Sequence, residues 1–167
     1  MESTWSKVTL YLKIWTTTAL EQWAIPIKLD PLWQQGNYTK DSRPMAGLTA
    51  SLMFITQIAL HPEYINQVGA ELSHFALEDK PLNNILSDHA ITAWLHDRAA
   101  SRAAMMDPNH LLYLVRACQL FLTGHGQSLT EGLMNIDANV LFIPANNDLL
   151  LMPYHARDAY TQLRKLN

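Results

Sequence analysis

The side chain that is best placed to take part in a reaction is the carboxylate of Asp148, because a strand-like apolar segment precedes it. Residues 140–143 read Val-Leu-Phe-Ile, a short apolar and β-prone run that predicts a buried strand. Asp148 follows this strand after the turn-forming residues 144–147, and sites in open α/β sheets form at the carboxyl ends of strands. A partly buried carboxylate at this place is suited to orient an imidazole, as the acid of a catalytic triad does.

A simpler role for Asp148 is local. An aspartate that follows Asn146 and Asn147 is typical of a turn, and it is equally suited to cap the helix that comes next. The local sequence taken alone favours this turn or cap role over a catalytic one.

Other catalytic and metal-binding patterns are absent from the sequence. It contains no G-x-S-x-G elbow to expose a nucleophilic serine, no H-E-x-x-H, no C-x-x-C, no G-x-G-x-x-G and no P-loop. No two histidines are four residues apart, so each is expected to lie at the surface or to cap a helix. We therefore predict no metal ion and no bound cofactor. The histidines are His61, His74, His89, His96, His110, His125 and His155.

The composition indicates a globular chain. Of the 167 residues, 49% are hydrophobic and 16% are charged, and the formal net charge is −3. Lysine and arginine do not cluster, so neither nucleic acid nor a membrane surface is an expected partner. No apolar run approaches the roughly 20 residues of a membrane helix. The single cysteine, Cys118, cannot form an internal disulfide; it favours a reducing, cytoplasmic location and is expected to be buried.

Helical periodicity dominates the rest of the sequence. Apolar residues recur at three- and four-residue steps over most of the chain, which predicts about seven helices. Pro26 and Asp30-Pro31 are expected to end the first, because proline interrupts the hydrogen bonds of a helix. Others are expected to begin at Pro62, at Pro108, and after the capping box of Ser128 and Glu131.

The strand at residues 140–143 is the one convincing strand among these helices. A lone buried strand leaves its backbone N–H and C=O groups unpaired, at a cost of about 1–3 kcal/mol each. It therefore needs neighbouring strands, either from a sheet that this chain does not encode or from another copy of the chain.

Three segments resemble, in the same order, the homoserine O-acetyltransferase family. Residues 139–153, with Asn-Asn-Asp-Leu-Leu and then proline after the strand, resemble the acid-bearing strand and loop of that family. Residues 27–38, with Ile-Lys-Leu-Asp-Pro followed by a tryptophan, a glycine and a tyrosine, resemble the segment between core and lid. Residues 107–117, Asp-Pro-Asn-His-Leu-Leu-Tyr-Leu-Val-Arg-Ala, resemble its lid helix with a Tyr-Leu-x-x-Arg-Ala pattern. The similarity runs from about Ala19 to Leu166.

The resemblance implies part of an α/β-hydrolase fold with a helical lid. The chain is then mostly α-helical, with one strand and helix of an incomplete α/β-hydrolase core. Residues 1–29 form a core helix that leads into the lid, residues 30–135 form the lid, and residues 136–167 form the strand, loop and helix of the core. In the family, the aspartate of this loop is the triad acid, which implies that role for Asp148.

The resemblance also implies a chemistry. The family transfers an acyl group from acyl-CoA, a co-substrate, to the hydroxyl of a small amino acid through an acyl-serine, in methionine biosynthesis. Its nucleophile corresponds to a position before residue 1 and its histidine to one after residue 167; His125 precedes the acid strand and is no substitute. Residues 21–24, Glu-Gln-Trp-Ala, lack the family's substrate-binding arginine, so the acceptor stays open, as does the choice between transfer and hydrolysis.

Two interpretations follow. In the first, the chain is a catalytically incomplete part of such an enzyme, because a triad without serine and histidine has no acyl-enzyme route. Its expected partner is then a complementing core fragment or a second copy of the chain. In the alternative, the chain is a noncatalytic helical module that associates with itself. The tryptophans Trp5, Trp15 and Trp23 of the first helix would contribute to either interface.

Overall fold

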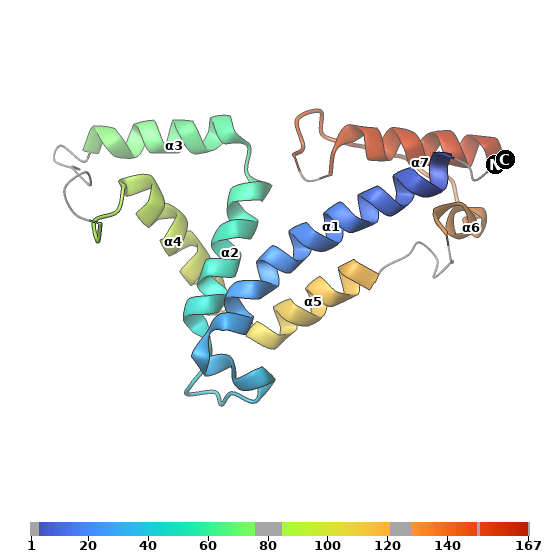
Figure 1. The fold of residues 1–167 in the computed structure, drawn as a ribbon. Coiled ribbons are helices and arrows are strands. Elements are labelled where there is room, and N and C mark those ends of the chain that lie inside the picture. Colours follow the sequence, from blue (N-terminus) through green and yellow to red (C-terminus); the bar gives the residue numbers. More distant parts are fainter. Residues whose placement is uncertain (1–3, 76–84, 121–127, 150, 167) are drawn as a thin grey trace. The chain divides into compact units, whose positions relative to one another are not determined.

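The computed structural model describes residues 4–75, 85–120, 128–149 and 151–166; helices dominate these ranges except 128–149, which is mostly irregular (Figure 1). This confirms the predicted mostly α-helical class. Helices begin at Pro62 and Pro108, as the sequence predicts. The elements are α1 (Thr4–Leu29), the short 3-10 helix η1 (Pro31–Gly36), α2 (Met45–Ala59), α3 (Pro62–Phe75), α4 (Ala90–Ala103), α5 (Pro108–Leu120), α6 (Leu129–Met134) and α7 (Pro153–Leu166).

The predicted strand is not formed. Residues 140–143 have no regular secondary structure, and no strand occurs anywhere in the described ranges. The side chains of Leu141 and Ile143 are 81% and 84% exposed, although their sequence is typical of a buried strand. A strand is completed by the backbone hydrogen bonds of a neighbour. The described part of the chain offers none, so the apolar run stays exposed instead of entering a sheet.

The first helix ends just before Asp30-Pro31, as the sequence predicts, but it is not interrupted at Pro26. α1 continues through Pro26 to Leu29, although proline removes one helical hydrogen bond. The turn after the proline is kept because Ile27 is completely buried and because the N–H of Asp30 donates to the carbonyl oxygens of Pro26 and Ile27, at 3.1 and 3.2 Å. Burial of an isoleucine is worth roughly 1.5–3 kcal/mol, which offsets most of the cost of the proline.

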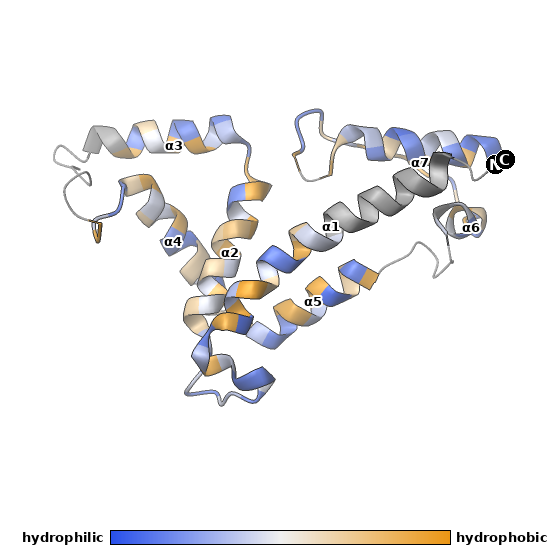
Figure 2. Cartoon of the chain, in the orientation of Figure 1, coloured by the Kyte–Doolittle hydropathy of each residue, from blue (hydrophilic) through white to orange (hydrophobic). Residues whose placement is uncertain are grey.

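The chain divides into two compact units, and each is described by itself. One unit comprises Glu21–Val115. Within it, α2 packs against α4, and α3 packs against α4. Small side chains on α4, Ala99 and Ala103, are fully buried and permit α2 to approach closely. In Figure 2, α2 is largely pale or apolar in colour, as expected for the central helix of a unit.

Helix α2 begins against the end of α1. The N–H of Gly47 donates to Oδ2 of Asp30 at 2.8 Å, while the N–H of Leu32 donates to Oδ1 of the same carboxylate at 2.9 Å. A carboxylate at a helix N-terminus satisfies a backbone donor that has no partner within the helix. One side chain, Asp30, therefore caps both η1 and α2 and fixes the corner between α1 and α2.

The other unit comprises Met1–Leu20 and Arg116–Asn167. Within it, α6 packs against α7, with Leu133 and Leu163 buried. The predicted cap of α6 is confirmed, because Oγ of Ser128 accepts the N–H of Glu131 at 3.1 Å. Helix α7 is largely hydrophilic in Figure 2, as is typical of a helix that buries only one narrow side.

Cys118 is exposed, so the prediction that it is buried is wrong. The buried stripe of α5 runs from Leu111 through Val115 to Gln119, and Cys118 lies just outside it. The amide of Gln119 donates to the carbonyl oxygen of Thr17 at 3.2 Å, which explains why a polar residue is buried there. Among the described residues, no helix is both long and apolar enough to cross a membrane.

Candidate functional site

Asp148 lies in the loop that leads into α7. Its Oδ1 accepts the N–H of Leu151 at 2.7 Å, and its own N–H donates to the carbonyl oxygen of Ala145 at 3.4 Å. The side chain is half-buried. These hydrogen bonds close the turn that the local sequence favours. They also hold the carboxylate in a fixed orientation just before α7 begins at Pro153.

The loop around Asp148 is apolar and open. Leu149 is 57% exposed and Leu151 is 67% exposed, although residues of this kind are usually covered. A carboxylate held in such a loop becomes a strong hydrogen-bond acceptor once further protein covers the loop and excludes water. The arrangement is suited to receive an imidazole N–H from outside the described residues; the acid role of Asp148 stays a prediction.

A second cluster joins two segments that are far apart in sequence. Nε1 of Trp33 donates to Oδ1 of Asn109 at 3.0 Å, across 76 residues, and Nδ2 of Asn109 donates to the carbonyl oxygen of Gly36 at 2.9 Å. These residues belong to the two segments, 27–38 and 107–117, that resemble the acyltransferase family. The two segments that resemble the family therefore contact each other in the structure.

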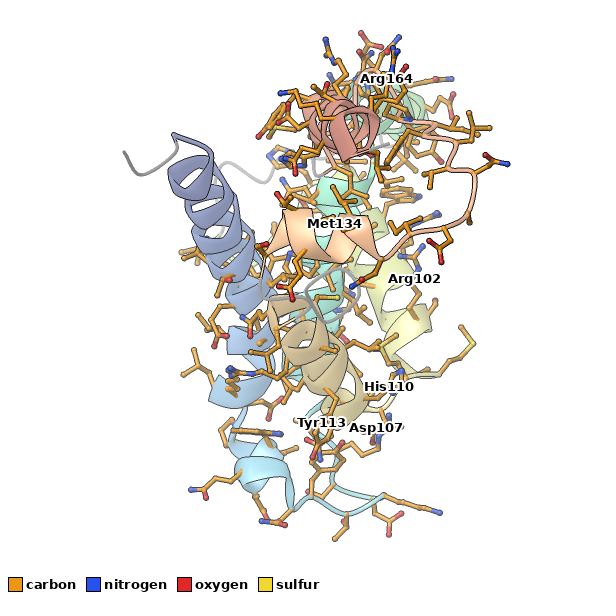
Figure 3. All side chains as sticks on the ribbon, turned by 90° about the vertical axis from the view of Figure 1, so that its right-hand side faces the viewer. Arg102, Asp107, His110, Tyr113, Met134 and Arg164 are labelled. Carbon is orange, nitrogen blue, oxygen red and sulfur yellow. The ribbon has the colours of Figure 1, made fainter. Side chains whose placement is uncertain are left out.

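Tyr38 and Asp107 extend this cluster. The hydroxyl of Tyr38 donates to Oδ2 of Asp107 at 2.8 Å and accepts the N–H of Asn109 at 3.0 Å. Oδ1 of Asp107 accepts the N–H of His110 at 3.0 Å, so Asp107 caps α5. Arg43 donates to the carbonyl oxygen of Met106 beside them. Figure 3 shows Asp107 and His110 together at the start of α5.

These contacts shift two pKa values in opposite directions. Burial raises the pKa of Asp107, but hydrogen bonds from the Tyr38 hydroxyl and the His110 N–H, with the charge of Arg43, outweigh it, and the net shift is downward. Burial raises the pKa of Tyr38, and the hydrogen bond and charge of Asp107 raise it further, against the N–H of Asn109. At neutral pH the pair is therefore a neutral tyrosine beside an ionised aspartate.

Replacing Tyr38 by phenylalanine should weaken the pH dependence of this cluster. The carboxylate of Asp107 stabilises the folded chain above its unfolded pKa of about 3.9, and this contribution is lost as the pH falls through the lowered folded pKa. Without the hydroxyl, the pKa of Asp107 should rise toward its ordinary value, and about 1 kcal/mol of stability should be lost at neutral pH. Carboxyl carbon NMR titration measures the first effect. Tyr64→Phe, at an exposed tyrosine of α3, is the matched control.

Among the described residues, no group of three or more His, Cys, Asp or Glu is placed to hold a metal ion. Nδ1 of His61 accepts the N–H of Glu63 at 3.3 Å, a capping role, and His96 lies at the surface beside Asp97. His125 lies outside the described residues. The sequence did not predict that Asn109 links segments 27–38 and 107–117, because nothing apart from their resemblance to one family relates the two segments.

The sequence is similar to several homoserine O-acetyltransferases. It is 30% identical over 144 residues to the one from Methanosalsum zhilinae, covering 86% of this chain and 29% of that protein. It is 29% identical over 136 residues to the one from Leptospira biflexa, covering 80% of this chain and 34% of that protein. The chain thus spans about a third of the length of these relatives. No family profile matches the sequence.

Solved structures of an esterase and of a homoserine O-acetyltransferase superpose on this chain. Esterase E22 superposes on 92% of this chain with a TM-score of 0.86 and 54% sequence identity, over 42% of its own length. The homoserine O-acetyltransferase from Bacillus anthracis superposes on 90% of this chain with a TM-score of 0.80 and 28% identity, over 40% of its length. The chain is therefore a homologue of the homoserine O-acetyltransferases and of esterase E22, and it represents a part of their α/β-hydrolase fold.

Proposed function

We propose that this chain is the acid-bearing part of a serine-dependent acyl-transfer enzyme or esterase. The observation that carries the proposal is the collinear match of 80–92% of the chain to such enzymes, combined with a carboxylate held at the entry to α7. In this proposal Asp148 orients a histidine that the remainder of the fold supplies and balances its charge. The histidine would take the proton of a serine hydroxyl as the serine attacks the acyl carbon.

The reaction then proceeds in two halves. The attack forms a serine ester and releases the first alcohol or thiol, which leaves with the proton held by the histidine. A second nucleophile, either water or a hydroxyl of an amino acid, attacks the serine ester, and the histidine removes its proton. The bond between the acyl carbon and the serine oxygen then breaks, and the histidine returns the proton to that oxygen as the acylated product leaves. Acyl-CoA is the donor when the enzyme is a transferase. Throughout both halves Asp148 stays ionised and stabilises the imidazolium.

Water is the acceptor that we favour. The chain is 54% identical to an esterase but only 28% identical to a solved homoserine O-acetyltransferase. In addition, residues 21–24 lack the arginine that the resemblance places there for the amino-acid substrate, and the carboxylate of Glu21 instead pairs with Lys28 at 2.5 Å. Without that arginine, these residues do not supply the two-pronged hydrogen bond that a guanidinium makes to the carboxylate of homoserine.

A hybrid enzyme tests the proposal. The chain alone should hydrolyse activated esters and acetylate homoserine only at background rates, since its sequence has no nucleophile elbow. Replacing the matching 42% of esterase E22 by this chain should restore ester hydrolysis. Hydrolysis by the chain alone that a serine-directed inhibitor abolishes would contradict the incomplete triad, and a folded but inactive hybrid would contradict the enzymatic role.

We further propose that the exposed apolar run at residues 140–143 pairs with the remaining hydrolase core. Val140, Leu141 and Ile143 are 45%, 81% and 84% exposed, and a β-prone segment that pairs with no strand of the described residues is a template for another strand. The core is the favoured occupant because the relatives that this chain matches are two to three times longer.

The free chain should therefore associate. At micromolar concentration, light scattering should give a mass above that of the monomer, because several large apolar side chains remain exposed. The side chains of Trp5 and Trp15, which the sequence places at such an interface, lie outside the described residues. Adding the complementary part of esterase E22 should convert these species into a one-to-one complex. A stable monomer that unfolds cooperatively would contradict this prediction. A defined homodimer that does not bind the complementary part of esterase E22 would favour the noncatalytic self-associating module.

A further inference from the structure

The turn before Asn37 has an unusual backbone. Gln34, Gln35 and Gly36 have φ angles of 47°, 56° and 92°, so three consecutive residues are left-handed. Glycine adopts this conformation freely, but in glutamine the β carbon crowds the following carbonyl. Both glutamine side chains are exposed, so their own packing does not hold the turn. Backbone of this kind persists only where surrounding contacts impose it.

Asn109 supplies these contacts from the first turn of α5. Its amide group bonds both ends of the turn, accepting the indole N–H of Trp33 at 3.0 Å and donating to the carbonyl oxygen of Gly36 at 2.9 Å. The fit is close, because a β carbon at position 36 would lie 3.3 Å from Nδ2 of Asn109. An asparagine offers a donor and an acceptor on one planar group, which both bonds require.

We propose that residues 34–36 form a strained latch, which Asn109 holds closed and which opens without unfolding of the packed helices α2 and α4. When the latch opens, Gln34 and Gln35 can return to right-handed backbone, and the chain after them changes direction. Tyr38 lies two residues beyond the turn, so its bonds to Asp107 and to the N–H of Asn109 depend on the closed state. This device does not depend on the proposed enzymatic function.

Amide hydrogen exchange on the full chain tests the latch. The N–H of Asn37 donates to the carbonyl oxygen of Gln34 at 3.1 Å and reports directly on the turn. Asn109→Ala should reduce its protection by about tenfold or more, because two hydrogen bonds are lost, while the amides of α4 keep theirs. Asn109→Asp should act similarly, since a carboxylate accepts from Trp33 but cannot donate to Gly36.

Relief of the strain distinguishes a latch from an ordinary loop. Gln34→Gly with Gln35→Gly should leave Asn37 at least as protected as in the native chain and should restore most of the protection lost in Asn109→Ala. Gln57→Gly, at an exposed right-handed position of α2, is the matched control and should only weaken its helix. Faster exchange of Asn37 in the double glycine variant, unchanged exchange in Asn109→Ala, or an equal loss in α4 would each overturn the proposal.

Discussion

Gly47→Ala is expected to lower the free energy of unfolding by about 2 kcal/mol or more, although alanine favours a helix over glycine by about 1 kcal/mol. A β carbon at position 47 would lie 2.5 Å from the carbonyl oxygen of Pro26 and 2.8 Å from Cα of Ile27. Both are backbone atoms at the buried end of α1, so they cannot turn aside as a flexible side chain would. The start of α2 would have to move away from the carboxylate of Asp30, whose Oδ2 accepts the Gly47 N–H.

The matched control for this substitution is Gly69→Ala in α3. A β carbon there meets only the side chain of Ile91, at an ordinary contact distance of 3.7 Å, and the helix gains the intrinsic preference of alanine. This variant should be as stable as the native chain or slightly more stable. Urea unfolding followed by helical circular dichroism compares the two. Equal midpoints for Gly47→Ala and Gly69→Ala would show that α1 and α2 are not in close contact at Gly47.

Local backbone chemistry explains which parts of the fold could be predicted. A proline at the first position of a helix and a serine before a helix act through their own residues, so the starts at Pro62, Pro108 and after Ser128 follow from the sequence. Pro26 is different, because the burial of Ile27 decides whether the helix continues past the proline. That burial depends on other helices, which no local pattern reveals.

The missing strand and the hydrogen-bonded cluster could not be predicted from local sequence either, because both depend on partners that are distant in the sequence. Residues 140–143 have the composition of a strand, but a strand exists only when another strand supplies hydrogen bonds. The partners within the cluster are also distant, since 69 residues separate Tyr38 from Asp107. Periodicity does not predict such pairs, and the resemblance placed the two segments separately, one between core and lid and the other in the lid helix.

The position of Asp148 was predictable from a turn after an apolar run, whereas its role requires an experiment. Its carboxylate accepts the N–H of Leu151 through Oδ1, and an asparagine at this place keeps the same acceptor. Asp148→Asn should therefore preserve the loop and remove only the negative charge. Asp148→Ala, in contrast, removes both the charge and the turn, so its effects on activity and on folding would be mixed.

In the hybrid with esterase E22, Asp148→Asn should lower kcat by about 10³- to 10⁴-fold, which is the effect expected when a triad acid no longer stabilises the imidazolium or fixes its tautomer. The thermal midpoint should stay close to that of the active hybrid. Asp137→Asn, at an exposed aspartate before the same apolar run, is the matched control and should leave kcat unchanged. A loss of less than about threefold in the Asp148→Asn hybrid would correspond to under 1 kcal/mol of transition-state stabilisation, and Asp148 would then be a turn residue alone.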